Sequence, residues 1–245
     1  MIHCGIFKAI PLKVASPKKT PALFTVGFGK PSITPIDLLT AIEPKGVICF
    51  FSALEIYNLT TQMPSHHNIC TLSKSKNTNS ARHLHIANLP ASSHRPRNPI
   101  GTLLFEYDTL PYYSNRRKQA LVPGVTERFM SSKNRYHITT VEQTLLDTLQ
   151  HPFPCGGPEV IFEVWENQDN INQDALQKLL ITIDNNALCR RVGAMFDLFK
   201  YKYNNDLAVL LEKSRLQIER ETLSLPLLAG MNYSALDNKW KILVP

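Results

Sequence analysis

The sequence predicts an α+β fold: a short mixed N-terminal segment, an antiparallel sheet, and then a helical cluster with a final strand. Three observations indicate this order. Prolines interrupt residues 1–33, apolar and polar side chains alternate between residues 68 and 138, and helical spacing begins at Thr140. The chain has 245 residues, of which 43% are hydrophobic, so it is long enough to bury a core. We expect two parts, residues 1–33 and residues 34–245.

The first elements are short. Four prolines in residues 1–33 favour short strands and turns over a helix. Thr34 followed by Pro35 is typical of an N-cap and a first helical residue, and Pro44 should end that helix. A second short helix is expected over residues 51–59, with its apolar side chains facing inward.

The sheet region follows. Several stretches rich in β-branched and aromatic residues show a period of two, which predicts half-buried strands. The strand candidates are residues 82–87, 101–107, 125–130 and 135–139. Two loops of Ser, Asn, Pro and basic residues are expected at residues 74–80 and 90–99. We expect the strands to form an antiparallel sheet.

The helical cluster begins at residue 140. Thr140 and Gln143 have the spacing of a capping box, and leucines in the next two turns form a buried stripe. The Pro- and Gly-rich residues 151–158 end this helix. Further helices are expected at residues 159–167, 173–183, 187–199 and 206–214, and a final strand at residues 239–244.

Cysteine content and hydropathy predict a cytoplasmic protein. Five scattered cysteines fit reduced thiols better than a disulfide scaffold, which would use an even number in a shorter chain. No apolar run reaches the roughly 18 residues of a transmembrane helix. The N-terminus lacks the charged and apolar segments of a signal peptide. We therefore expect no membrane partner.

The positive charge is one-sided. The net charge is +7, and residues 1–135 carry 17 Lys and Arg against 6 Asp and Glu. Residues 136–245 carry 10 against 14, so the whole excess lies in the first half. This distribution is typical of proteins with a polyanionic partner, most often nucleic acid, or with an acidic protein partner. It is equally typical of an ordinary solvated surface, and charge alone does not separate the two.

Patterns for metal binding and catalysis are weak. His66, His67 and Cys70 are close in sequence, but no Cys-x-x-Cys pair accompanies them, so no zinc site is expected. No Gly-x-Ser-x-Gly motif occurs, and the Gly-flanked Cys155 is better explained by a turn. Residues 27–30 lack the full spacing of a phosphate-binding loop. We expect no cofactor.

Basic side chains form the stronger pattern. Arg and Lys in loops beside aromatic residues can hold phosphates and stack on bases. Three clusters in the first half have this character, and the last, expected in a loop, follows Tyr112 and Tyr113. The candidate nucleic-acid-binding residues are Lys13, Lys18, Lys19, Arg95, Arg97, Arg116, Arg117 and Lys118.

Four stretches together resemble a known family. They are PKGVICFFSALEIYNLT at residues 44–60, HITTVEQTLLD at 137–147, a stretch beginning CGGPEV and ending in Trp at 155–165, and RRVG at 190–193. In this order they resemble the AbiEi family, the antitoxins of type IV toxin–antitoxin (abortive infection) modules. The resemblance runs from about residue 40 to the closing residues 240–245. Its specificity lies in the order and spacing of the stretches, none of which is a catalytic motif.

The resemblance implies a two-part protein. Such antitoxins carry an N-terminal winged helix-turn-helix that represses their own operon, and a C-terminal domain that neutralises the nucleotidyltransferase-like toxin AbiEii without a stable complex. Residues 5–11 resemble the closing strand of the wing, and no helix-turn-helix precedes them in this sequence. We therefore expect residues 1–33 to be a winged-helix remnant and residues 34–245 to be the antitoxin domain.

Three functions stay open from the sequence. The leading one is a non-enzymatic antitoxin and transcriptional regulator that contacts nucleic acid, DNA in preference to RNA, through its basic half. The alternative is a restriction-like nuclease or RNA-modifying enzyme, for which Asp108 and Glu127 are the candidate carboxylates. The third is a degenerate chain that folds but binds nothing specific.

Overall fold

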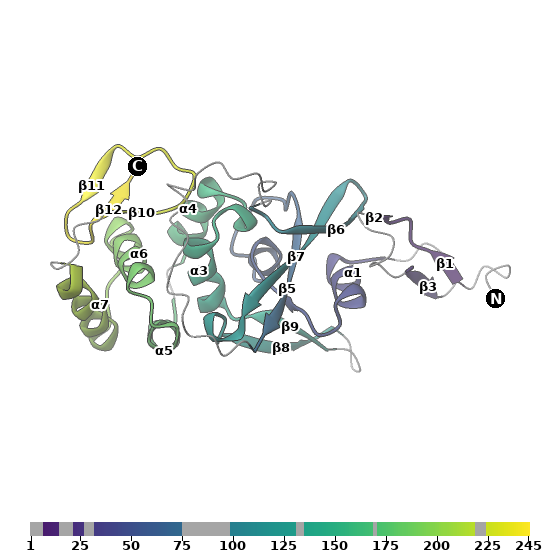
Figure 1. Cartoon of the computed structure of the whole chain (residues 1–245), viewed down its shortest axis with the longest axis horizontal. Helices are drawn as coiled ribbons and strands as arrows, with labels where there is room; N and C mark the ends of the chain where they lie inside the picture. Colours follow the sequence, from purple (N-terminus) through teal and green to yellow (C-terminus); the bar gives the residue numbers. More distant parts are fainter. Residues whose placement is uncertain are drawn as a thin grey trace.

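The computed structural model describes residues 7–14, 22–26, 32–74, 99–130, 135–168, 171–218 and 224–245. The molecule is elongated, with a short β-ribbon at its N-terminal end, a sheet in the middle, and helices with a small sheet at its C-terminal end (Figure 1). This arrangement confirms the predicted α+β class. The candidate strand 82–87 lies outside the described residues, as does most of the two expected loops.

Seven strands form the main sheet among the described residues. In spatial order they are β2 (Lys13–Val14), β6 (Thr102–Tyr107), β7 (Leu110–Lys118), β5 (His67–Ser73), β4 (Val47–Ile48), β9 (Arg135–Thr139) and β8 (Val125–Phe129). The sheet is mixed, which corrects the antiparallel expectation, because β4 pairs with β9 and β5 with β7 in parallel. Alternation in a sequence reports which face of a strand is buried, and it does not report the direction of the neighbouring strand.

Helices cover both faces of this sheet. Helix α1 (Pro35–Ile42) packs Leu38 and Leu39 on one face, against side chains that include Ile69 of β5. Helix α3 (Val141–Gln150) packs its leucines on the other face, against side chains that include Val47 of β4 and Cys70 of β5. The short helix α2 (Phe51–Ile56) follows β4 directly and ends three residues earlier than expected.

The start of α1 has the predicted capping. The Thr34 side chain accepts a hydrogen bond from the Asp37 backbone N–H, and the Asp37 carboxylate accepts one from the Thr34 backbone N–H. This reciprocal arrangement satisfies the first donors of the helix. At α3 only half of it forms: Thr140 accepts from the Gln143 N–H, whereas the Gln143 side chain turns into the core.

The helical cluster matches the expected segments within one residue at most boundaries. It continues from α3 through α4 (Pro158–Glu166), α5 (Gln173–Ile183), α6 (Asn186–Leu198) and α7 (Asn205–Ile218). Short 3₁₀ turns η3 (Gln119–Leu121) and η4 (Phe153–Cys155) lie before β8 and α4. Within the described ranges, no helix combines the length and the apolar character needed to cross a membrane.

Two small sheets lie at the ends of the molecule. At the C-terminal end, β12 (Ile242–Val244) lies between β10 (Leu225–Pro226) and β11 (Ala235–Asp237), which confirms the expected final strand. At the N-terminal end, β1 (Phe7–Ala9) pairs antiparallel with β3 (Phe24–Val26). Strand β2, also within residues 1–33, instead joins the edge of the main sheet beside β6.

Candidate functional site

The predicted nucleic-acid-binding residues divide into two groups. Those that lie outside the described residues are Lys18, Lys19, Arg95 and Arg97. Those described are Lys13 on β2 and Arg116, Arg117 and Lys118 at the end of β7. The last three were expected in a loop, and the structure corrects this, because they pair with residues 71–73 of β5.

Lys13 and Arg116 are exposed cations in separate places. The Lys13 Nζ lies 3.0 Å from the Glu106 Oε2, and Glu106 is paired across the sheet with Pro111. From Pro111 to Arg116 the strand runs roughly 17 Å. Arg116 therefore stands with the half-buried Lys118 at the far end of β7, apart from Lys13.

Arg117 points into the interior and forms a bidentate ion pair. Its Nη1 and Nη2 donate to the two carboxylate oxygens of Asp147 on α3 at 2.6 and 2.7 Å. The two side chains are 6% and 0% exposed. The Gln143 amide donates to the same carboxylate at 2.9 Å, and the guanidinium lies 5.1 Å from the centre of the Phe50 ring.

This environment removes Arg117 from the nucleic-acid-binding set. Burial opposes its charge, but the Asp147 carboxylate and its hydrogen bonds outweigh burial and raise the pKa of Arg117. Two of the five N–H donors of the guanidinium bind the carboxylate and the side chain is out of solvent, so a phosphate could reach it only by breaking the buried ion pair. The physical reason is strand alternation, which sends Arg116 and Arg117 to opposite faces of β7.

The thiols near this ion pair are also internal, as is His66. Cys49 and Cys155 are buried, and burial raises the pKa of both thiols, so neither is an activated nucleophile. Cys155 precedes Gly156 in the left-handed region with φ of 93°, as a turn requires. His66 lies with its Nε2 3.1 Å from the Pro154 carbonyl oxygen. In the described part of the chain no three His, Cys, Asp or Glu side chains could hold a metal ion.

The structure does not bring the two candidate nuclease carboxylates together. Asp108 is exposed in the turn between β6 and β7, whereas Glu127 lies on the edge strand β8 and pairs with Arg135 at 2.8 Å. Four strands separate β6 from β8, which corresponds to roughly 24 Å. Asp108 and Glu127 cannot share a metal ion at that separation.

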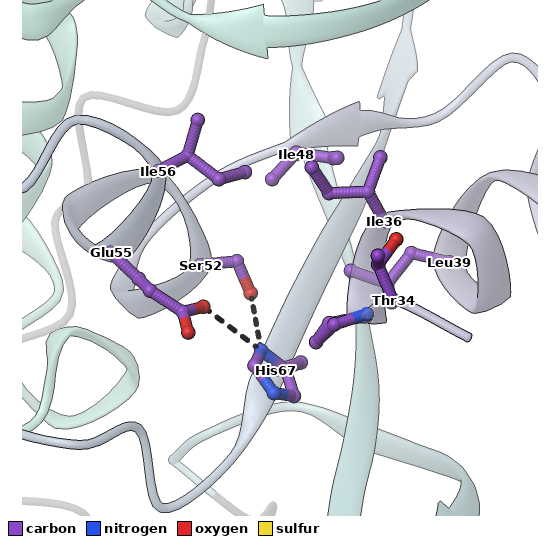
Figure 2. Close-up of a pocket in the computed structure, with 9 residues that line it drawn as sticks. Thr34, Ile36, Leu39, Ile48, Ser52, Glu55, Ile56 and His67 are labelled. Carbon is purple, nitrogen blue, oxygen red and sulfur yellow. Dashed lines mark hydrogen bonds and ion pairs between the residues drawn. The ribbon is translucent and has the colours of Figure 1, made fainter. Parts of the chain in front are cut away.

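A cavity that the sequence did not indicate lies between α1 and α2, over β4 and β5. Its volume is about 200 Å³. Figure 2 shows polar side chains from α2 and β5 facing apolar side chains from the surrounding elements. The polar ones are Ser52, Glu55 and His67, and the apolar ones are Ile36, Leu39, Ile48 and Ile56. Thr34 and Pro35, at the start of α1, complete the lining.

Ser52, Glu55 and His67 are the residue types of a catalytic triad, but their geometry is different. Ser52 Oγ and Glu55 Oε2 approach the same atom, His67 Nδ1, at 3.4 and 3.7 Å. In a triad the histidine uses one nitrogen for the nucleophile and the other for the carboxylate. Ser52 is also 2% exposed and accepts the Asn68 backbone N–H at 2.8 Å. The three side chains therefore form the polar side of the cavity and not an activated nucleophile.

The pocket carries negative charge at neutral pH. Burial, helped by nearby His66, lowers the pKa of His67 to about 4, so its ring is neutral. Burial raises the pKa of Glu55, whose side chain stays 42% exposed, so water still stabilises its carboxylate. No sequence signal marks the site, because His67 reaches Ser52 and Glu55 only once β5 pairs beside β4.

No known family model matches this sequence, and no curated protein matches it.

Proposed function

We propose that this protein is a non-enzymatic antitoxin and transcriptional regulator of the AbiEi type, which counteracts a nucleotidyltransferase-like toxin without a stable complex. One observation carries the proposal. The four stretches that resemble the family are far apart in sequence, yet they pack into one region around α3. A shared order and spacing would be expected if these stretches specify a common scaffold.

Specific contacts join the stretches. Gly156 lies so close to Phe51 of α2 that an added Cβ would be 2.8 Å from that ring, which links the first and third stretches. The Trp165 indole N–H donates to the Thr148 hydroxyl at 3.0 Å, which links α4 to α3. On α6, Gly193 leaves room for the indole ring of Trp240.

Several ionisable groups of these stretches form contacts within the protein. Asp147 holds Arg117, and Arg190 donates to the Trp240 carbonyl oxygen at 2.8 Å. Glu163 accepts hydrogen bonds from the backbone and hydroxyl of Thr61. Side chains committed in this way support a structural role for the stretches, so contacts with other molecules fall to exposed residues.

Arg116 and Lys118 at the end of β7 are the proposed nucleic-acid contact. Arg116 is exposed and Lys118 is half-buried beside it. We place the protein in the cytoplasm and expect it to bind DNA in preference to RNA. Four described cysteines are free and buried, which is compatible with a reducing compartment. If phosphates are the target, log affinity should fall with log salt at a slope near −0.9 for each phosphate contact.

A growth-rescue assay tests the antitoxin activity. The chain is co-expressed with the nucleotidyltransferase-like product of a neighbouring gene, in a host that this toxin alone arrests. We expect growth to resume. Continued arrest, with the chain soluble and the toxin active, would mean that the resemblance concerns fold and not function.

Paired variants then test the DNA contact. Arg116→Ala with Lys118→Ala should weaken DNA binding evenly across sequences and lower the salt slope. The matched control is Lys178→Ala with Lys213→Ala, which removes two exposed cations from α5 and α7. Equal binding by both double variants would remove the assigned role of β7.

A further inference from the structure

We propose that the cavity between α1 and α2 binds a small primary amine, with an ammonium group at Glu55 and a compact apolar body against the isoleucines. This inference goes beyond the antitoxin function and does not depend on it. It rests on the shape of the cavity, on the division of its lining into a polar and an apolar side, and on the sign of its charge.

The size of the cavity limits the ligand to a small molecule. A volume of about 200 Å³ is equivalent to about seven water molecules. It is smaller than the roughly 300–1,000 Å³ of pockets for drug-sized ligands. A short branched alkyl chain or a single aromatic ring fills such a space, whereas a nucleotide does not fit.

The apolar side selects a hydrophobic body. Ile36 and Ile56 face each other from α1 and α2, and Ile48 lies between them on β4 (Figure 2). Leu39 and Ile48 are themselves 0% exposed, so this wall is part of the packed interior and is held rigidly. Ile36 and Ile56 are only half-buried, and water in contact with them is readily displaced by an apolar group.

The polar side selects a cation. Glu55 is the charged side chain of the lining at neutral pH, because His67 is neutral. Among the described residues no lysine or arginine forms an ion pair with Glu55, and the Nδ1 of the neutral His67, 3.7 Å from its Oε2, supplies no counter-charge. A half-buried carboxylate without a counter-charge is stabilised by an ammonium ligand.

An anion is disfavoured at the same site. The start of α1 lies at the cavity and its helix dipole would attract negative charge. However, the Asp37 carboxylate already accepts the Thr34 backbone N–H at 2.8 Å and its hydroxyl at 2.6 Å. The carboxylates of Asp37 and Glu55 therefore both repel an anionic ligand.

The hydroxyl and the imidazole complete the recognition. The Ser52 oxygen accepts the Asn68 N–H, so its own proton is directed at His67 Nδ1. The Nε2 of the neutral ring then carries the proton. These groups are fixed before a ligand arrives, and Glu55 at the mouth is the group left to pair with an ammonium.

Calorimetric titration of the full chain near neutral pH tests the proposal. The probes are isopentylamine and benzylamine, with isopentanol and isovalerate as neutral and anionic counterparts of the first. We expect at least one amine to bind saturably, isopentanol to bind about tenfold more weakly or less, and isovalerate not to bind. No saturable binding by either amine, or equal binding of amine and alcohol, would overturn the proposal.

Variants locate the site. Glu55→Gln should weaken the amine about tenfold or more, while the exposed Glu166→Gln on α4 should leave its affinity unchanged. Ile36→Phe should also reduce binding by filling the cavity, without touching Glu55. Unchanged affinity in Glu55→Gln would refute the assignment, and that variant removes a half-exposed group, so it is expected to fold.

A lysine side chain carries the same ammonium chemistry. Titration with N-acetyl-lysine methylamide distinguishes a free small amine from the lysine side chain of a protein partner. Weaker binding than isopentylamine supports a free amine, because the unbranched lysine chain presents no branched apolar end to Ile36 and Ile56. Tighter binding than both amine probes would overturn the free-amine proposal in favour of a lysine from a protein partner.

Discussion

The ion pair between Arg117 and Asp147 should make Arg117 a stability residue and not a nucleic-acid-binding one. We consider Arg117→Met, which keeps much of the volume and leaves Asp147 without its counter-charge. Asp147 is 0% exposed, so water cannot replace the guanidinium. Breaking a buried pair by removing one partner typically costs about 3–5 kcal/mol. For a chain of this size that corresponds to a fall in Tm of about 6–20 °C.

A double-mutant cycle isolates the interaction. Asp147→Leu alone should cost a similar amount, because it leaves the Arg117 charge buried. The combination Arg117→Met with Asp147→Leu should cost less than the sum, since no charge remains unpaired. Some loss should persist, because the Gln143 amide also donates to Asp147 and would lose that acceptor, at about 1–3 kcal/mol.

Chemical denaturation followed by circular dichroism measures the free energies of unfolding. Arg116→Met is the matched control, since it changes the neighbouring exposed arginine and should stay within about 0.5 kcal/mol of wild type. The reasoning is refuted if Arg117→Met leaves stability within about 1 kcal/mol of wild type while DNA binding falls. In that case the guanidinium would be available to phosphates after all.

Three further predictions concern stability. Gly193→Ala should lower the free energy of unfolding by about 1–3 kcal/mol, because the added methyl group overlaps the Trp240 ring; an unchanged melting curve would contradict this contact. Thr34→Ala should cost about 1 kcal/mol in urea denaturation through loss of the α1 cap, and a neutral result would show that the cap is dispensable. The low pKa of His67, about 4 against an ordinary 6.5, means that only the unfolded chain takes up this proton between those values. Stability should therefore fall as pH falls through that interval, by up to about 1.4 kcal/mol per unit, and His67→Gln should flatten the slope. An identical slope in wild type and variant would assign the dependence to another group such as His66, whose pKa burial also lowers.

Helices were the more predictable part of the fold because their signals are local. The Thr34 cap, the proline after it, and the leucine spacing of α3 each involve residues within a few positions of one another. The sheet was less predictable. The two-residue strand β4 is too short to show a period, yet it is an interior strand of the sheet, with β5 antiparallel on one side and β9 parallel on the other.

The candidate site was not predictable for a similar reason. Ser52 and Glu55 belong to one short helix, but His67 reaches them only through the pairing of β4 with β5. Such a contact joins residues that no local spacing relates. The predicted nucleic-acid-binding residues included Arg117, which the structure buries. A count of charges in residues 116–118 does not distinguish an exposed arginine from one that points into the core.

The same distinction between buried and exposed side chains decides which observations bear on function. Several residues of the four resembling stretches, among them Ala53, Asp147 and Gly193, are buried, whereas Glu55 of the first stretch is half-exposed. Substituting these buried residues would lower the stability of the protein whatever its activity, so loss of growth rescue in such variants carries no information about recognition. Arg116 and Glu55 are exposed or half-exposed, on different elements, and can be changed while the core stays intact. Loss of DNA binding in one and of amine binding in the other would therefore report two separate surfaces on one scaffold.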